Sequence, residues 1–193
     1  IIQLNSLTLA LATGLAINVQ GTAIRAPRNE SEPMLMYSRM VEAGTLQYWG
    51  STSESSAKFD WDAAWENQAS WPPVASSAVL YANEQCGSNN VVCSDTNGAP
   101  TDLCKRLINT LLNSPGVIVP SNVNGVSLTS DRSICWIGWR DTITNMPQGN
   151  LVDAAAATMG KCGSAVDVSG WAENVNLNNV CSRQCLSNRL GCW

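Results

Sequence analysis

Large apolar side chains alternate with small or polar ones near the start of the chain. From Leu7 to Gln20, the odd positions other than Thr13 carry Leu, Ile and Val, whereas even positions carry Thr, Ala, Gly, Asn and Gln. A period of two is typical of a strand, so we predict a strand here, folded as a hairpin at Thr13-Gly14. The alternating residues are Leu7, Leu9, Leu11, Leu15, Ile17 and Val19.

Residues 1–24 also contain no charged side chain. A signal peptide or a membrane span would carry a basic start or a continuous apolar run, and neither is present. We therefore expect a processed mature N-terminus and no transmembrane segment. An uncharged strand is an unprotected sheet edge unless the rest of the fold covers it.

Further along the chain, the spacing of apolar residues switches between helical and strand periods. Leu103, Leu107 and Leu111 recur at helical spacing behind Thr101, a candidate N-cap. Asp60 is a candidate N-cap for a shorter helix. We predict helices over residues 60–69, 101–113 and 147–161, and strands over residues 44–50, 74–83, 117–119, 126–128, 132–139 and 166–177. Residues 21–38 are turn-rich, and 181–193 form a cysteine-pinned tail.

The order of these elements predicts the fold class. Residues 75 to 180 follow a β-α-β-β-α-β order, which describes an α+β fold, a split β-α-β sandwich. Its antiparallel sheet carries two helices on one face. We divide the chain into a cysteine-free, β-rich N-terminal extension, 1–74, that packs on or extends the sheet, and a disulfide-rich α/β sandwich, 75–193.

All eight cysteines lie in the second part of the chain, which favours a disulfide framework. An even number of cysteines without paired C-x-x-C spacing fits up to four disulfides in an oxidising compartment better than zinc. A reduced cytosolic protein with buried thiols is the alternative. Bridges between helices and sheet would suit Cys104, Cys135 and Cys162, but the pairing stays open. The cysteines are Cys86, Cys93, Cys104, Cys135, Cys162, Cys181, Cys185 and Cys192.

Composition excludes several kinds of chemistry. The chain has no His and a net charge of −4. A Ser-His-Asp triad and a His-ligated zinc are therefore excluded, and phosphate-driven nucleic-acid binding is not expected. We find no phosphate-binding glycine motif and expect no metal, no cofactor and no catalytic residue. The enzyme alternative is a glycosidase that uses Asp60, Asp62 and Glu66, set against an amphipathic helix with outward acids.

Tryptophan is the main candidate for a binding surface. The chain has eight Trp against one Phe. Exposed Trp would suit a carbohydrate or a protein, whereas buried Trp would fill the core in place of Phe. Trp136 and Trp139 are three apart on a predicted strand, so they face opposite sides of the sheet. We take Trp49, Trp139, Trp171 and Trp193 as the candidate binding surface.

One sequon, Asn29-Glu30-Ser31, lies between prolines in an exposed linker. In a secreted protein Asn29 would be a glycosylation acceptor.

The cysteine-bearing part resembles a known family. The residues that carry the resemblance are Cys86-Gly87-Ser88, Cys93-Ser94-Asp95, Cys104 on a helix, Cys162 closing a second helix, Val175-Asn176-Leu177 before Cys181, and Cys185 to Arg189 with Cys192. They are similar to the cysteine-rich secreted fungal proteins of the WD-like family and, more loosely, to yeast and smut killer toxins. The resemblance implies secretion, disulfides and a small α/β sandwich, and it supplies no catalytic residue. Killer toxins act on target-cell membranes or ion channels without catalysis.

Two functions therefore remain open. The first is a secreted, extracellular, non-enzymatic toxin or effector that binds a target-cell protein, lipid or glycan. The second is a structural or carbohydrate-binding protein that self-assembles as a homo-oligomer through residues 1–24.

Overall fold

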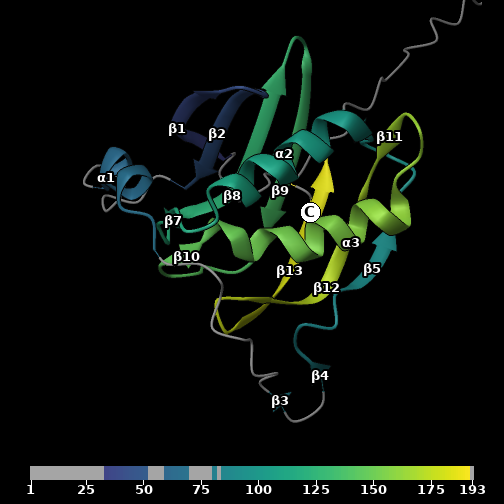
Figure 1. The fold of residues 1–193 in the computed structure, drawn as a ribbon. Coiled ribbons are helices and arrows are strands. Elements are labelled where there is room, and N and C mark those ends of the chain that lie inside the picture. Colours follow the sequence, from purple (N-terminus) through teal and green to yellow (C-terminus); the bar gives the residue numbers. More distant parts are fainter. Residues whose placement is uncertain (1–32, 52–58, 70–79, 82–83, 192–193) are drawn as a thin grey trace, which may run out of the picture. The chain divides into compact units, whose positions relative to one another are not determined.

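The computed structural model describes residues 33–51, 59–69, 80–81 and 84–191 (Figure 1). The chain divides into two compact units, Ile1–Glu30 and Ser31–Trp193. The predicted strand within residues 1–24 and the sequon at Asn29 lie outside the described residues. All the helices and strands of the described residues belong to the second unit.

A seven-stranded sheet forms the centre of this unit, and all of its neighbouring strands are antiparallel. Three of its pairs are hairpins closed by two residues. In one of them Asn178 and Asn179 both have positive φ, as a type I′ turn requires. The strands, in spatial order, are β1 (Met34–Val41), β2 (Gly44–Gly50), β8 (Val123–Ser130), β9 (Ser133–Trp139), β13 (Val180–Ser187), β12 (Gly170–Leu177) and β5 (Asn90–Cys93).

Two helices cover one face of this sheet (Figure 1). Helix α2 (Thr101–Asn113) buries Leu103, Leu107 and Leu111 in one stripe, because residues three and four apart share a helix face. Helix α3 (Val152–Cys162) follows a 3₁₀ turn, Gln148–Leu151, and buries Ala154 and Ala155. The core lies between these stripes and the inward side chains of the strands.

The remaining elements are short. Helix α1 (Trp61–Glu66) begins after Asp60, whose carboxylate accepts a hydrogen bond from the Ala63 N–H at 2.9 Å. Three two-stranded pairs complete the described part: β3 (Leu80–Tyr81) with β4 (Glu84–Gln85), β6 (Ala99–Pro100) with β11 (Asp167–Val168), and β7 (Ile118–Val119) with β10 (Met146–Pro147).

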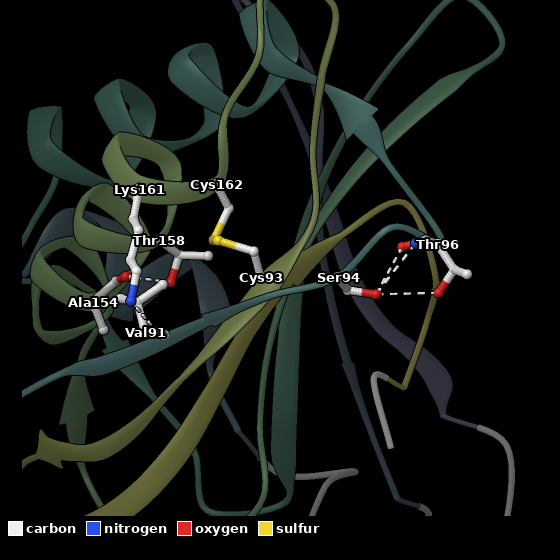
Figure 2. Close-up of a disulfide and its surroundings, with 8 residues drawn as sticks. All are labelled: Val91, Cys93, Ser94, Thr96, Ala154, Thr158, Lys161 and Cys162. Atoms are coloured by element: carbon white, nitrogen blue, oxygen red, sulfur yellow. Dashed lines mark hydrogen bonds between the residues drawn. A yellow bond between two sulfur atoms is a disulfide. The ribbon is translucent and has the colours of Figure 1, made fainter.

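Two disulfides fasten the helices to the sheet. Cys104 on α2 is bonded to Cys135 on β9, and Cys162 at the end of α3 is bonded to Cys93 on β5. Beside the second bridge, Lys161 Nζ donates to the Val91 carbonyl at 2.7 Å (Figure 2). The sequence-based expectation of helix-to-sheet bridges at Cys104, Cys135 and Cys162 is confirmed.

A buried hydrogen-bonded pair, Tyr48 and Gln148, joins the sheet to the 3₁₀ turn that precedes α3. The Tyr48 hydroxyl donates to Gln148 Oε1 at 2.5 Å, and Gln148 Nε2 donates to the Ser114 carbonyl at 2.6 Å. Burial raises the pKa of Tyr48 well above its usual range. This hydroxyl therefore stays protonated and keeps its role as a donor.

The α+β class, with an antiparallel sheet and two helices on one face, is confirmed. Strands β1 and β2 belong to the same sheet. Three local predictions were wrong. Residues 34–38, which were expected in a turn-rich segment, belong to strand β1, and residues 180–187 form β13 in the sheet interior rather than a tail. Thr101 is not a cap, because its hydroxyl donates to the Ser164 carbonyl at 3.0 Å and Pro100 takes the cap position.

Two glycine-to-alanine changes provide a test of the packing. A Cβ at Gly125 on β8 would overlap the Trp136 ring, whereas a Cβ at Gly160 on α3 meets nothing within 4 Å. We expect Gly125→Ala to lower the free energy of unfolding by about 1 to 3 kcal/mol through overpacking. Gly160→Ala, the matched control, should raise it by about 0.5 to 1 kcal/mol. Denaturant unfolding measures both values, and equal effects would contradict the packing described here.

Candidate functional site

The side of the sheet opposite α2 and α3 carries a polar group of side chains on β12 and β13. On β12, Ala172, Val175 and Leu177 lie in the core. Successive side chains of a strand point to opposite faces, so Trp171 and Glu173 lie on the face away from the helices. Both are partly buried.

A β-bulge creates this arrangement. The β12–β13 register shifts between Ala172 and Val175, so that Glu173 and Asn174 together oppose Arg183. Asn174 has a φ of +57°, in the left-handed region that Asn tolerates better than most residues. Bulges re-aim side chains and often lie beside functional sites. Here the bulge places a carboxylate and a guanidinium side by side.

The pair is tightly connected. Arg183 Nη2 lies 2.6 Å from Glu173 Oε1, and the Trp171 indole Nε1 donates to the same oxygen at 3.0 Å. The Arg183 and Glu173 side chains are each 34% exposed. Charge-assisted hydrogen bonds of this length are the stronger kind, so the three side chains hold one another in fixed orientations.

A depression of about 490 Å³ lies over this group. Its size falls within the range of small-molecule sites, roughly 300 to 1,000 Å³. A second guanidinium, that of Arg140, borders it and lies 3.6 Å from Asp141 Oδ2. Its lining is mostly polar and consists of Asn90, Val91, Val92, Arg140, Glu173, Asn174, Cys181, Ser182 and Arg183.

The predicted tryptophans are distributed over both faces. Trp171 adjoins the depression through Glu173. Trp49 donates to Ser127 Oγ at 2.9 Å and packs edge-on against Trp136, with ring centroids 6.2 Å apart.

Trp139 is 1% exposed in the core, so its assignment to the binding surface was wrong. Trp136 and Trp139 do lie on opposite faces, since Trp139 alone of the two belongs to the core cluster. Trp193 lies outside the described residues.

The predicted cysteines form bridges in part. Besides Cys93–Cys162 and Cys104–Cys135, Cys185 is disulfide-bonded. Cys86 and Cys181 are thiols in the structure. Cys192 lies outside the described residues.

The acidic residues of the glycosidase alternative do not line the depression. Asp60 caps α1, and Asp62 accepts a hydrogen bond from the Tyr37 hydroxyl at 3.4 Å. The tryptophans between these acids contact β1: Trp61 stacks on Tyr37 with ring centroids 4.8 Å apart, and the Arg39 guanidinium lies 4.7 Å from the centroid of the Trp65 ring. This segment acts as an amphipathic helix that anchors β1.

The residues that sequence reasoning missed are Arg140, Glu173 and Arg183. An uninterrupted strand over residues 166–177 would place Trp171, Glu173 and Val175 on the same face. The bulge adds one residue, so the side chains after Glu173 lie on the opposite faces from those that simple alternation gives. Arg183 was missed because its strand was not predicted.

Metal clusters and membrane-spanning helices are both absent from the described residues. No group of three or more metal-ligating side chains occurs in that part of the chain. No helix there is long and apolar enough to cross a membrane.

Comparison with known proteins identifies the family. A family model described as Fungal WD-like matches residues 34–193, from the first residue of β1 onward. The match therefore begins well before Cys86, where the resemblance in the sequence started. No curated protein and no solved structure matches. The matched segment spans most of the chain, and the chain belongs to the fungal WD-like family.

Proposed function

We propose that this protein is an extracellular, non-enzymatic binding protein of the toxin or effector type, and that it binds a neutral, hydroxyl-rich glycan on a target cell. The observation that carries the proposal is the polar depression of β12 and β13 beside Trp171. Among the described residues, no helix covers this face of the sheet, and hydrogen-bond donors and acceptors of fixed orientation lie there next to the indole ring of Trp171.

The depression suits sugar hydroxyls because it offers both kinds of hydrogen-bonding group. Guanidinium groups donate, carboxylates accept, and the amides of Asn90 and Asn174 do both. Val92, which is 42% exposed and lines the depression, adds apolar surface for the C–H face of a sugar ring, and Trp171 lies beside it on the neighbouring strand.

The charges at the depression favour a neutral ligand over an anionic one. Arg183 is paired with Glu173, and Arg140 is paired with Asp141. The two guanidinium groups therefore leave no excess positive charge that would attract a phosphate or a carboxylate. The pairing of Arg183 with Glu173 also fixes the donor geometry of Arg183 before a ligand arrives, which lowers the entropy that binding would cost.

Two further observations support an extracellular, non-enzymatic role. Disulfides form and persist in oxidising compartments, and two bridges tie the helices to the sheet. Hydroxyl or thiol nucleophiles are usually activated by His, and the chain has none. Of the acids of the glycosidase alternative, Asp60 caps α1 and Asp62 accepts a hydrogen bond from Tyr37.

Replacing Arg183 tests the glycan proposal. We expect Arg183→Ala to weaken binding of glucan, mannan or chitin oligosaccharides by roughly 10- to 100-fold, because a hydrogen bond to a charged group is worth about 1.5 to 3 kcal/mol. Isothermal titration calorimetry measures the change.

The matched control is Arg106→Ala, since Arg106 lies on α2 and donates to the Ala43 carbonyl away from the depression. It should bind as the unmodified protein does. The proposal fails if no neutral oligosaccharide binds, or if an acidic oligouronate binds and the neutral ones do not.

A second candidate function, self-assembly, is favoured by the edge strand β1. Three large apolar side chains on it are exposed: Met34 at 51%, Leu35 at 46% and Met40 at 75%. The opposite edge strand, β5, is only four residues long, and its Val91 carbonyl already accepts a hydrogen bond from Lys161. Proteins usually protect sheet edges by such short strands and lysines. Strand β1 would pair with a second copy of the chain.

Met40→Lys tests self-assembly, because a charge on an edge strand blocks pairing between copies. We expect the unmodified protein to associate as its concentration rises and Met40→Lys to remain monomeric. Val166→Lys, at a residue 77% exposed outside the seven-stranded sheet, should behave like the unmodified protein. Light scattering after size exclusion measures the mass. A monomeric unmodified protein at every concentration would rule the candidate out.

A further inference from the structure

Two cysteine thiols meet where the segment before β5 crosses the β12–β13 hairpin. Cys86 follows β4, and Cys181 lies on β13, in register with Asn176. The Gly87 N–H donates to the Asn174 carbonyl at 2.6 Å, and Cys86 Sγ lies 4.0 Å from the Val175 carbonyl. These contacts hold Cys86 against the strand that pairs with Cys181.

The two side chains lie close enough to interact. Cys86 is 4% exposed and lies beside the strand whose Asn176 is in register with Cys181. Burial, and then the contact with Cys181, raises the pKa of the Cys86 thiol to about 12. Cys86 therefore stays protonated at neutral pH and is a poor initial nucleophile, so the first attack falls to Cys181.

The other cysteines that the structure describes already form disulfides. Of the cysteines that the structure describes, Cys93, Cys104, Cys135, Cys162 and Cys185 are disulfide-bonded, and Cys86 and Cys181 are the two thiols that remain. A contact between two thiols in a framework of helix-to-sheet bridges is the arrangement that precedes a disulfide.

We propose that Cys86 and Cys181 are joined by a disulfide in the protein matured in an oxidising compartment. The bridge would tie the segment entering edge strand β5 to the β12–β13 hairpin. Because Cys181 lines the depression, the bridge would also fix one wall of it.

The reaction requires a disulfide oxidant, such as oxidised glutathione or the disulfide of a thiol oxidoreductase. The Cys181 thiolate attacks one sulfur of the oxidant, forms a mixed disulfide and releases one thiol. Cys86 then loses its proton to solvent and attacks the Cys181 sulfur, which releases the second thiol. Two electrons and two protons pass from the cysteines to the oxidant, which is reduced to two thiols.

Peptide mapping of the secreted full chain tests the bridge. Free thiols are blocked with N-ethylmaleimide, and the protein is digested without reduction and analysed by mass spectrometry. We expect a peptide that links Cys86 to Cys181, with no N-ethylmaleimide on either residue. The proposal is overturned if both residues carry the label, or if either is linked to Cys185 or Cys192.

A set of variants gives an independent readout. Cys86→Ser, Cys181→Ser and the double variant should each lower Tm by about 5 to 15 °C, and the double variant should lose no more than either single variant, because all three remove the same bond. Under reducing conditions the differences should shrink. Losses that add in the double variant, or single variants that melt like the unmodified protein, would show separate thiols instead.

Discussion

The attachment of two helices to one face of the sheet is the constraint on which the rest of this structure depends. The Cys104–Cys135 bridge joins α2 to an interior strand, and the Cys93–Cys162 bridge joins α3 to an edge strand. Between these anchors, the apolar stripes of both helices bury the inward side chains of the strands. Because both helices occupy one face, the outer face of β12 and β13 carries polar side chains, and it is there that the candidate site lies.

The elements with strong local signals could be predicted from the sequence. The helix at residues 101–113, the strand at residues 44–50 and the N-cap Asp60 agree with the structure. Strand β13 was missed because Cys181 and Cys185 suggested a pinned tail, although it pairs with two neighbours inside the sheet. Sheet pairing is a long-range property, and cysteines four residues apart give no indication of it.

The sequence pattern predicted only part of the candidate site, and the physical reason differs from the one for β13. A period-two pattern assumes an uninterrupted strand, and the bulge at Glu173 and Asn174 adds one residue that reverses the phase. Trp171 was found because it precedes the bulge. Trp139 was assigned to the wrong face because a single sequence does not tell which of Trp136 and Trp139 faces the helices. Trp139 lies in the core. Family membership supplies no chemistry for the site, so the proposed function rests on Glu173, Arg183 and their neighbours.

In the proposed division of roles, the helices hold the framework together and the opposite face of the sheet binds the ligand. Hydrogen–deuterium exchange of the oxidised protein tests it most directly, measured with and without a saturating neutral oligosaccharide chosen from glucan, mannan and chitin fragments. We expect slower exchange in β12, β13 and the adjoining β5, with unchanged exchange in α1, α2 and α3. Slower exchange confined to the helices, with none in β12 and β13, would contradict it.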